Sequence, residues 1–215
     1  MLVLSTRDEA CPQDLEASTM SSSDIGTDGA RTRAPRVVVM GVTGCGKTTA
    51  GAALAQRLRV PFADADDFHP EANVTKMAAG IPLDDDDRSP WLFRLATWLR
   101  DHEETGAVIG CSALKVKYRD ILRSGAPELT FLHLHGDREV VAARVAGRPG
   151  HFMPASLVDS QYDTLEPLRE DEAGVAIDFA LPVDVIIDDY VRAFPAQAVP
   201  GDPVVPGDPV VPAAS

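Results

Sequence analysis

One short segment of the chain carries the clearest chemical signal. Residues 41–48 read Gly-Val-Thr-Gly-Cys-Gly-Lys-Thr and match the pattern G-x-x-x-x-G-K-[ST]. Glycines at these positions let backbone N–H groups point inward and form an anion nest at a helix N-terminus. The pattern predicts that Lys47 reaches the β- and γ-phosphates of a nucleoside triphosphate and that the Thr48 hydroxyl ligates Mg²⁺. A chance match is disfavoured because a strand is predicted before the segment and a helix after it.

A second chemical group follows the next predicted strand, where the sequence reads Asp64-Ala65-Asp66-Asp67-Phe68-His69. Carboxylates two residues apart at a strand terminus can face the crevice beyond the carboxyl ends of the strands, where ligands bind in parallel sheets. One carboxylate would orient Mg²⁺ through water while the other aligns an acceptor hydroxyl. Phosphoryl transfer is largely positioning and charge neutralisation, so a carboxylate of ordinary pKa suffices. The alternative is an acidic loop that is merely solvated.

The elements that must position these groups alternate along residues 36–195. Short apolar runs predict strands at 36–40, 62–64, 107–111, 129–134 and 175–179. Helical periods predict helices at 48–58, after Ser89-Pro90, at 115–122, at 138–145 and along 183–194. Ser89 is the expected N-cap of its helix, with Pro90 in the first turn and a polar stretch from Asp66 to Arg88 before it. This alternation predicts a parallel sheet with helices on both faces.

Composition limits the partners of this chain. Its 215 residues are 45% hydrophobic and 25% charged, which suits one folded domain with tails. Its 20 Lys and Arg against 33 Asp and Glu give a net charge of −13, which argues against nucleic-acid and membrane-surface partners. We find no secretory signal and no apolar run long enough to span a bilayer, so we expect a cytoplasmic protein. Three scattered cysteines suit neither a disulfide framework nor a zinc cluster.

Both ends of the chain differ from its centre. Residues 1–35 are rich in Ser, Thr, Asp and Gly without an apolar period, so we expect a disordered tail, which an alternative start at Met20 would shorten. Residues 196–215 are rich in proline and contain the sequence Val-Pro-Gly-Asp-Pro-Val twice, which predicts a second disordered tail. Residues 36–195 form the expected domain.

Taken together, these blocks and several others resemble bacterial gluconokinases. The similar blocks are 41–48, 64–70, 73–83, 85–92, 111–120, 150–153 and 160–167. They cover nearly all of the expected domain in order, and the blocks outside 41–48 are specific as a set. Ala65 departs from the pattern at a position where glycine is common, and both tails lie outside it.

The resemblance implies a P-loop kinase fold of the kind found in nucleoside monophosphate and shikimate kinases. It has a five-stranded parallel sheet flanked by helices, a substrate-binding helical segment and a mobile lid, here about 144–154. The implied reaction is ATP-dependent phosphorylation of D-gluconate to 6-phospho-D-gluconate, which feeds the pentose phosphate or Entner–Doudoroff route. This family is often dimeric, and the sequence leaves a homodimer open. The alternatives are a kinase of the same fold for shikimate or a nucleoside monophosphate, and a nucleotide-dependent switch.

The resemblance also assigns roles to residues. The expected catalytic residues are Lys47, Asp66 and Arg148, with Asp66 holding and activating the acceptor hydroxyl. The expected ATP-binding residues are Gly41, Val42, Thr43, Gly44, Cys45, Gly46, Lys47, Thr48, Thr49, Arg144, Arg148 and Pro182. Thr48 and, through water, Asp64 would hold Mg²⁺, because the third strand ends in Cys111-Ser112 and lacks the usual carboxylate. The expected substrate-binding residues are Asp66, His69, Lys76, Arg88, Lys115 and Arg119.

Several assignments remain open at this level. Any of the four cations could meet the substrate carboxylate or form a surface ion pair instead. His69 either binds substrate or caps the segment beside Pro70. Cys45 is either an oxidisable thiol activated by Lys47 or a small residue that fills the loop.

Overall fold

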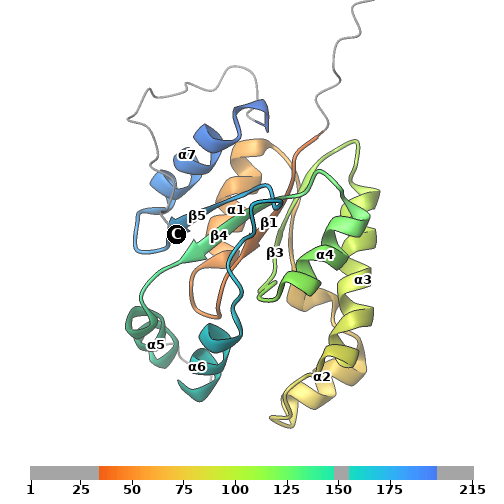
Figure 1. Ribbon diagram of the computed structural model, residues 1–215, viewed down its shortest axis with the longest axis vertical. Coiled ribbons are helices and arrows are strands. Elements are labelled where there is room, and N and C mark those ends of the chain that lie inside the picture. The colour runs from red at the N-terminus through yellow and green to blue at the C-terminus, as the bar shows by residue number, and fades with distance from the viewer. Residues whose placement is uncertain (1–33, 148–154, 198–215) are drawn as a thin grey trace, which may run out of the picture. The chain divides into compact units, whose positions relative to one another are not determined.

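The computed structural model describes residues 34–147 and 155–197 (Figure 1). The tails expected at 1–35 and 196–215 lie almost wholly outside the described residues. The expected lid, about 144–154, lies outside the described residues from 148 onward, and this part includes Arg148. Among the described residues, no helix combines the length and the apolar character needed to cross a membrane.

The described strands form one parallel sheet in the order β2-β3-β1-β4-β5. Their bounds are β1 (Arg36–Met40), β2 (Phe62–Asp64), β3 (Ala107–Gly110), β4 (Thr130–His135) and β5 (Gly174–Asp178). The predicted five-stranded parallel sheet is confirmed, with each strand displaced from its expected bounds by at most one residue. Because β1 is central and pairs with both β3 and β4, the loop that follows it emerges in the middle of the sheet edge.

Seven helices are described beside the sheet. They are α1 (Lys47–Leu58), α2 (Glu71–Ala78), α3 (Asp85–Asp101), α4 (Val116–Gly125), α5 (Arg138–Ala146), α6 (Ala155–Thr164) and α7 (Val183–Ala193), with 3₁₀ turns η1 (Ala65–Phe68) and η2 (Pro195–Gln197). Five of the helices were predicted. Helices α2 and α6 were not: α2 lies within the stretch that the sequence analysis treated as polar, and no helix was predicted over 155–164.

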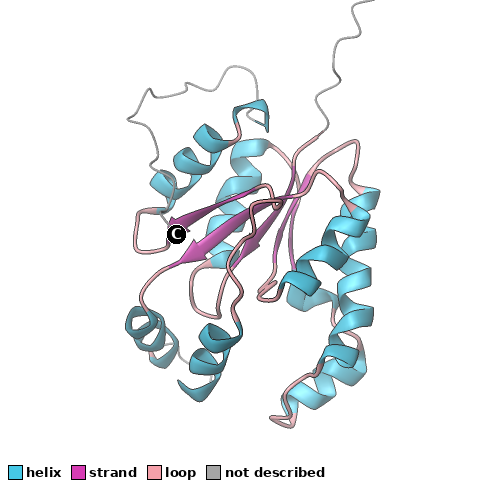
Figure 2. Cartoon of the chain, viewed as in Figure 1, coloured by secondary structure: helices cyan, strands magenta, loops and turns pink. Residues whose placement is uncertain are grey.

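The helices cover both faces of the sheet, as Figure 2 shows. Side chains alternate along β1, so Val37 and Val39 pack into one buried cluster with α1 and α7. Val38 and Met40 point the other way, into a cluster with α3 and α4. The central strand is therefore buried on both faces, which explains its uninterrupted β-branched sequence.

Helix α3 begins earlier than the sequence predicted. Asp84, and not Ser89, is its N-cap: the Asp84 carboxylate accepts a hydrogen bond from the Asp87 N–H at 2.8 Å, and the Asp87 carboxylate accepts one from the Asp84 N–H at 3.1 Å. This reciprocal capping box satisfies two otherwise free donors, so the acidic stretch forms the first turn of the helix. Pro90 consequently lies inside α3 and leaves one helical hydrogen bond unmade.

Candidate functional site

The loop between β1 and α1 has the conformation that its glycines predicted. Gly46 is the N-cap of α1 with φ +100°, and Gly44 has φ +78°; both angles are in the left-handed region that favours glycine. A Cβ atom on Gly44 would also lie 2.6 Å from the Val145 side chain on α5. The glycine at position 44 thus permits both the turn and the close approach of α5.

Lysine and threonine at the start of α1 lie beside the acidic pair. The Lys47 ammonium donates to the Val42 carbonyl of the loop at 2.9 Å. The Thr48 hydroxyl donates to Asp64 Oδ2 at 2.9 Å, and Asp64 Oδ1 accepts from the Asp66 N–H at 3.1 Å. Strand β2 brings Asp64 to this position because it pairs with β3, whose other neighbour is β1. The Thr48 hydroxyl oxygen and the Asp64 carboxylate, which come from separate elements, therefore lie together next to the loop.

The second carboxylate of the pair faces a histidine. Asp66 Oδ1 lies 3.9 Å from His69 Nε2. The His69 ring is stacked on the Trp91 indole with centroids 4.3 Å apart, and Trp91 is held by a 2.8 Å hydrogen bond from its Nε1 to the Ala65 carbonyl. His69 is therefore fixed by α3, and its imidazole edge is directed at Asp66.

These surroundings shift both pKa values. Partial desolvation and the charge of Asp64 raise the pKa of the Asp66 carboxyl; the side chain itself is 89% exposed, so solvent screens much of this effect. Burial and the nearby Arg88 charge lower the pKa of His69, against the opposing effect of Asp66. His69 is accordingly neutral near pH 7, and Asp66 is a better proton acceptor than an ordinary aspartate.

A pocket of about 710 Å³ collects these residues, a size typical of small-molecule sites. The loop and the start of α1 contribute Thr43, Gly44, Gly46, Lys47, Thr48 and Thr49 to its lining; the segment from the end of β2 into α3 contributes Asp64, Asp66, His69, Arg88 and Trp91. The end of β3 contributes Gly110, Cys111 and Ser112, helix α2 contributes Met77, and the α2–α3 connection contributes residues 80–83. The sequence motifs at 41–48 and 64–69 are thus brought into one cavity.

The four candidate cations have different environments. Arg88 lines the pocket, and among the described residues no carboxylate pairs with it. Lys76 is paired with Asp87 at 2.6 Å, and Lys115 lies 3.4 Å from Asp85; neither is among the residues that line the pocket. The structure therefore places one of the four cations in the pocket.

Arg119 is a correction to the expected substrate-binding set. Its guanidinium is completely buried and forms a bidentate pair with the equally buried Glu172, at 2.6 and 2.8 Å. Its remaining donors bond to backbone carbonyls, among them those of Glu166 at 3.0 Å and Pro167 at 2.9 Å. With all its donors directed to the protein, Arg119 fixes the segment before β5 and has none left for a ligand.

The expected ATP-binding residues beyond the loop are only partly placed. Arg144 is in the last turn of α5, where its guanidinium lies 5.0 Å above the Phe179 ring and donates to the Phe179 carbonyl at 3.4 Å. Pro182, the N-cap of α7, belongs to the same β5–α7 connection. Neither residue lines the pocket, so their contact with adenine stays a prediction.

The two described cysteines are small buried residues. Burial raises the pKa of the Cys45 thiol and outweighs the opposing charge of Lys47; it also raises the pKa of Cys111, at the end of β3, to about 12. Both thiols are therefore protonated and poorly reactive. Of the two interpretations of Cys45, the structure supports the small residue that fills the loop.

Sequence reasoning gave no role to Ser160 and Gln161, which line the pocket from α6. Gln161 Oε1 accepts a 2.6 Å hydrogen bond from the backbone N–H of Thr43 in the loop. The only signal in the sequence was that the block 160–167 belongs to the family resemblance.

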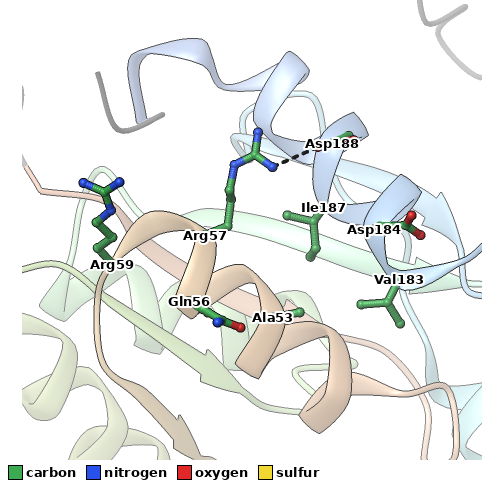
Figure 3. A pocket seen from close by; sticks show the side chains of 8 residues that line it. All are labelled: Ala53, Gln56, Arg57, Arg59, Val183, Asp184, Ile187 and Asp188. Carbon is green, nitrogen blue, oxygen red and sulfur yellow. Dashed lines mark hydrogen bonds and ion pairs between the residues drawn. The ribbon is translucent and has the colours of Figure 1, made fainter. Parts of the chain in front are cut away.

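A second cavity of about 510 Å³ lies between α1 and α7 (Figure 3). Arg57 on α1, Arg59 at its C-cap and two aspartates on α7 line it, and one pair, Arg57 and Asp188, is bonded at 3.1 Å. None of its described lining residues belongs to the loop at 41–48 or to the acidic pair. The candidate site is therefore the larger pocket.

Comparisons with known proteins agree with this geometry. The family model described as shikimate kinase matches residues 43–173. A thermosensitive gluconokinase of Escherichia coli K12 is 49% identical over 141 residues, covering 64% of this chain and 75% of the relative. A gluconokinase of Gluconobacter oxydans 621H is 44% identical over 163 residues, covering 75% of this chain and 92% of the relative.

A solved structure extends the similarity to three dimensions. The crystal structure of a gluconokinase from Sinorhizobium meliloti 1021 is 44% identical, with a TM-score of 0.69 over 76% of this chain and 93% of that one. The fold is thus that of a P-loop kinase, as the sequence predicted. With sequence identity this high over most of the relatives' length, the chain belongs to the gluconokinase family.

Proposed function

We propose that this protein transfers the γ-phosphoryl group of ATP to the 6-hydroxyl of D-gluconate and releases ADP and 6-phospho-D-gluconate. The observation that carries the proposal is the 2.9 Å contact between Thr48 and Asp64, because it joins the phosphate loop and the acidic pair within one pocket. The similar proteins are gluconokinases, which supports gluconate as the acceptor.

On the phosphate side, the loop amides and Lys47 bind the β- and γ-phosphates. The Lys47 ammonium, held on the Val42 carbonyl at 2.9 Å, exchanges that oxygen for phosphate oxygens when ATP binds. Thr48 and Asp64 offer adjacent oxygen atoms, the donor type that Mg²⁺ prefers, so we assign them to the metal. Bound there, Mg²⁺ supplies neutralisation of the charge on the phosphates.

On the acceptor side, Asp66 orients the 6-hydroxyl and accepts its proton. The hydroxyl oxygen forms a bond to the γ-phosphorus while the bond from that phosphorus to the β–γ bridging oxygen breaks, and ADP leaves with the bonding electrons. The raised pKa of Asp66 suits a group that takes up a proton as this transfer proceeds. Neutral His69, 3.9 Å away, is positioned to bind a neighbouring hydroxyl.

The carboxylate of gluconate requires a cation within reach of the same pocket, and we assign that role to Arg88. It lines the pocket from α3, and its guanidinium lies 5.9 Å from the centroid of the Tyr118 ring. A planar guanidinium binds a carboxylate through two parallel hydrogen bonds. Lys76 and Lys115 are paired with Asp87 and Asp85, which leaves Arg88 as the recognition residue.

The test is an assay of ADP release from purified protein supplied with ATP, Mg²⁺ and one acceptor at a time. Gluconate, shikimate and AMP are compared under the same conditions. We expect gluconate to support turnover far above the rate of ATP hydrolysis without acceptor. Strong turnover with shikimate or AMP and none with gluconate would reassign the acceptor, and slow hydrolysis indifferent to all three would point to a nucleotide switch.

A further inference from the structure

Helix α6 presents two different faces. On one face, Asp159 and Asp163 flank the Arg138 guanidinium of α5 at 3.3 and 2.9 Å, and Tyr162 lies beneath that guanidinium at 5.1 Å. The Tyr162 hydroxyl also donates to the Gly136 carbonyl at 3.0 Å. These contacts anchor α6 on α5 and on the end of β4.

The other face of α6 carries Gln161 into the pocket. Its Oε1 accepts the Thr43 backbone N–H at 2.6 Å, a contact between residues 118 positions apart. This hydrogen bond fixes the plane of the carboxamide against the phosphate loop. The anchored helix and the loop therefore hold Gln161 from two sides.

The donor half of this carboxamide is available. A glutamine side chain has one acceptor oxygen and two N–H donors on Nε2, and the oxygen is already used by Thr43. Among the described residues, none accepts a hydrogen bond from Nε2, although Gln161 lines the same pocket as Lys47 and Thr48. A fixed N–H donor beside a phosphate loop suits an anionic oxygen.

We infer that Gln161 is a further catalytic residue, whose Nε2 donates a hydrogen bond to an oxygen of the γ-phosphoryl group. This inference rests on the proposed phosphoryl transfer. The bond from Thr43 to Oε1 aims the donor before ATP arrives, so no reorientation is needed as charge shifts during transfer. Gln161 thus distinguishes a nucleoside triphosphate from a diphosphate, whereas the loop amides bind phosphates common to both.

The first experiment measures nucleotide affinity by calorimetry in the wild-type protein and in Gln161→Met, which keeps the length of the side chain without its donors. The probes are ADP and the non-hydrolysable β,γ-imido analogue of ATP, both with Mg²⁺. We expect Gln161→Met to weaken binding of the triphosphate analogue by about tenfold, as for one lost hydrogen bond to a charged group, with ADP affinity unchanged. Gln56→Met, the same exchange at an exposed residue of α1 that does not line this pocket, is the matched control and should change neither affinity.

If Gln161→Met weakens the binding of ADP and of the triphosphate analogue equally, Gln161 only shapes the loop. If neither affinity changes, Gln161 makes no contact with the nucleotide. Either result overturns the inference. Because calorimetry needs no acceptor, failure of the wild-type protein to use gluconate would refute the acceptor assignment alone. In the gluconate assay, Gln161→Met should lower kcat by at least about tenfold, with the KM for gluconate unchanged.

Discussion

At the scale of single residues, the carboxylates of Asp64 and Asp66 have different surroundings although they are only two positions apart. Asp64 accepts the Thr48 hydroxyl and the Asp66 N–H, whereas Asp66 faces His69 and has a raised pKa. Differences of this kind between neighbouring titratable groups separate their roles. The role of each can be tested by removing its charge alone.

Asp66→Asn should lower kcat by about 10² or more, because the acceptor hydroxyl loses its proton acceptor. ATP affinity should stay within a few fold of wild type, since Asp66 belongs to the acceptor side. Steady-state ADP release and calorimetry measure the two effects. Asp67→Asn changes the next carboxylate, which is exposed and does not line the pocket, and should be close to wild type. Full activity in Asp66→Asn would assign the hydroxyl to another group.

Arg88→Met should raise the KM for gluconate by about ten- to a hundredfold, the loss expected for a charged hydrogen-bonding contact. The neutral alditol with a hydroxyl in place of the carboxylate should be affected much less. The two acceptors are compared in the same ADP assay. Arg94→Met, which removes an exposed cation from the same helix, serves as the control. A change of equal size for both acceptors would show that Arg88 does not recognise the carboxylate.

Residue roles were predictable wherever the sequence pattern itself sets the geometry. The loop at 41–48 and the Asp64–Asp66 pair follow from local spacing, and the structure brings them together. Whether a cation is free to bind substrate depends on its ion-pair partner, which can be far away in the sequence: Asp87 is 11 positions from Lys76, and Glu172 is 53 positions from Arg119. Nothing local identifies such partners, and for the same reason the contact of Gln161 with Thr43 was not foreseen.

At the scale of elements, the start of α3 sets the position of the acceptor side. Asp87 accepts hydrogen bonds from the Asp84 N–H and from Lys76 on α2, and it directly precedes Arg88. The same carboxylate thus caps α3 and ties α2 to it. The hydrogen bond from the Lys76 ammonium and, to a lesser extent, that from the Asp84 N–H hold the pKa of Asp87 below its ordinary value.

Asp84→Ala should lower the free energy of unfolding by about 1 kcal/mol, the usual cost of a lost N-cap. Thermal unfolding measures the change. Asp86→Ala removes an equally acidic and exposed residue of the same turn that makes no capping bond, so it controls for the charge near the helix N-terminus. Equal destabilisation by both variants would show that charge, and not the capping box, stabilises the turn.

Sequence analysis found all five described strands and five of the seven described helices, and it placed the start of α3 too late. Ser89-Pro90 is a good local start signal, but the capping box around Asp84 and the ion pair to α2 outweigh the cost of an internal proline. Helices α2 and α6 lie at the pocket, and among their described side chains only Asn73 and Val158 are buried, so packing in the core gave little local signal for either helix.

At the scale of the whole molecule, the Arg119–Glu172 pair connects α4 to the segment before β5. Burial opposes ionisation of Glu172, but the hydrogen bonds from Arg119 and the Arg169 N–H outweigh it and lower the pKa of Glu172. A carboxyl with a lowered pKa stabilises the fold above its ordinary pKa, and this contribution is lost as pH falls through the lowered value. The pair therefore adds to stability at neutral pH and less in strong acid.

Arg119→Met should destabilise the protein by about 3–5 kcal/mol, because it leaves Glu172 buried and unpaired. Denaturant unfolding at pH 7 measures the loss. The double variant Arg119→Met with Glu172→Met should recover much of it, since no unpaired charge remains. A small effect of the single variant, together with a raised KM for gluconate, would return Arg119 to the substrate-binding residues.

The division of the pocket between two stretches of chain has one more consequence. The pocket residues assigned to the acceptor come from one continuous run, from Asp66 in η1 to Trp91 in α3, whereas those assigned to ATP come mainly from 43–49, with Asp64 beside Thr48. Such a continuous segment can be replaced as a unit without changing the loop that binds the nucleotide. The architecture thus lets the choice of phosphate acceptor be rewritten separately from the use of ATP.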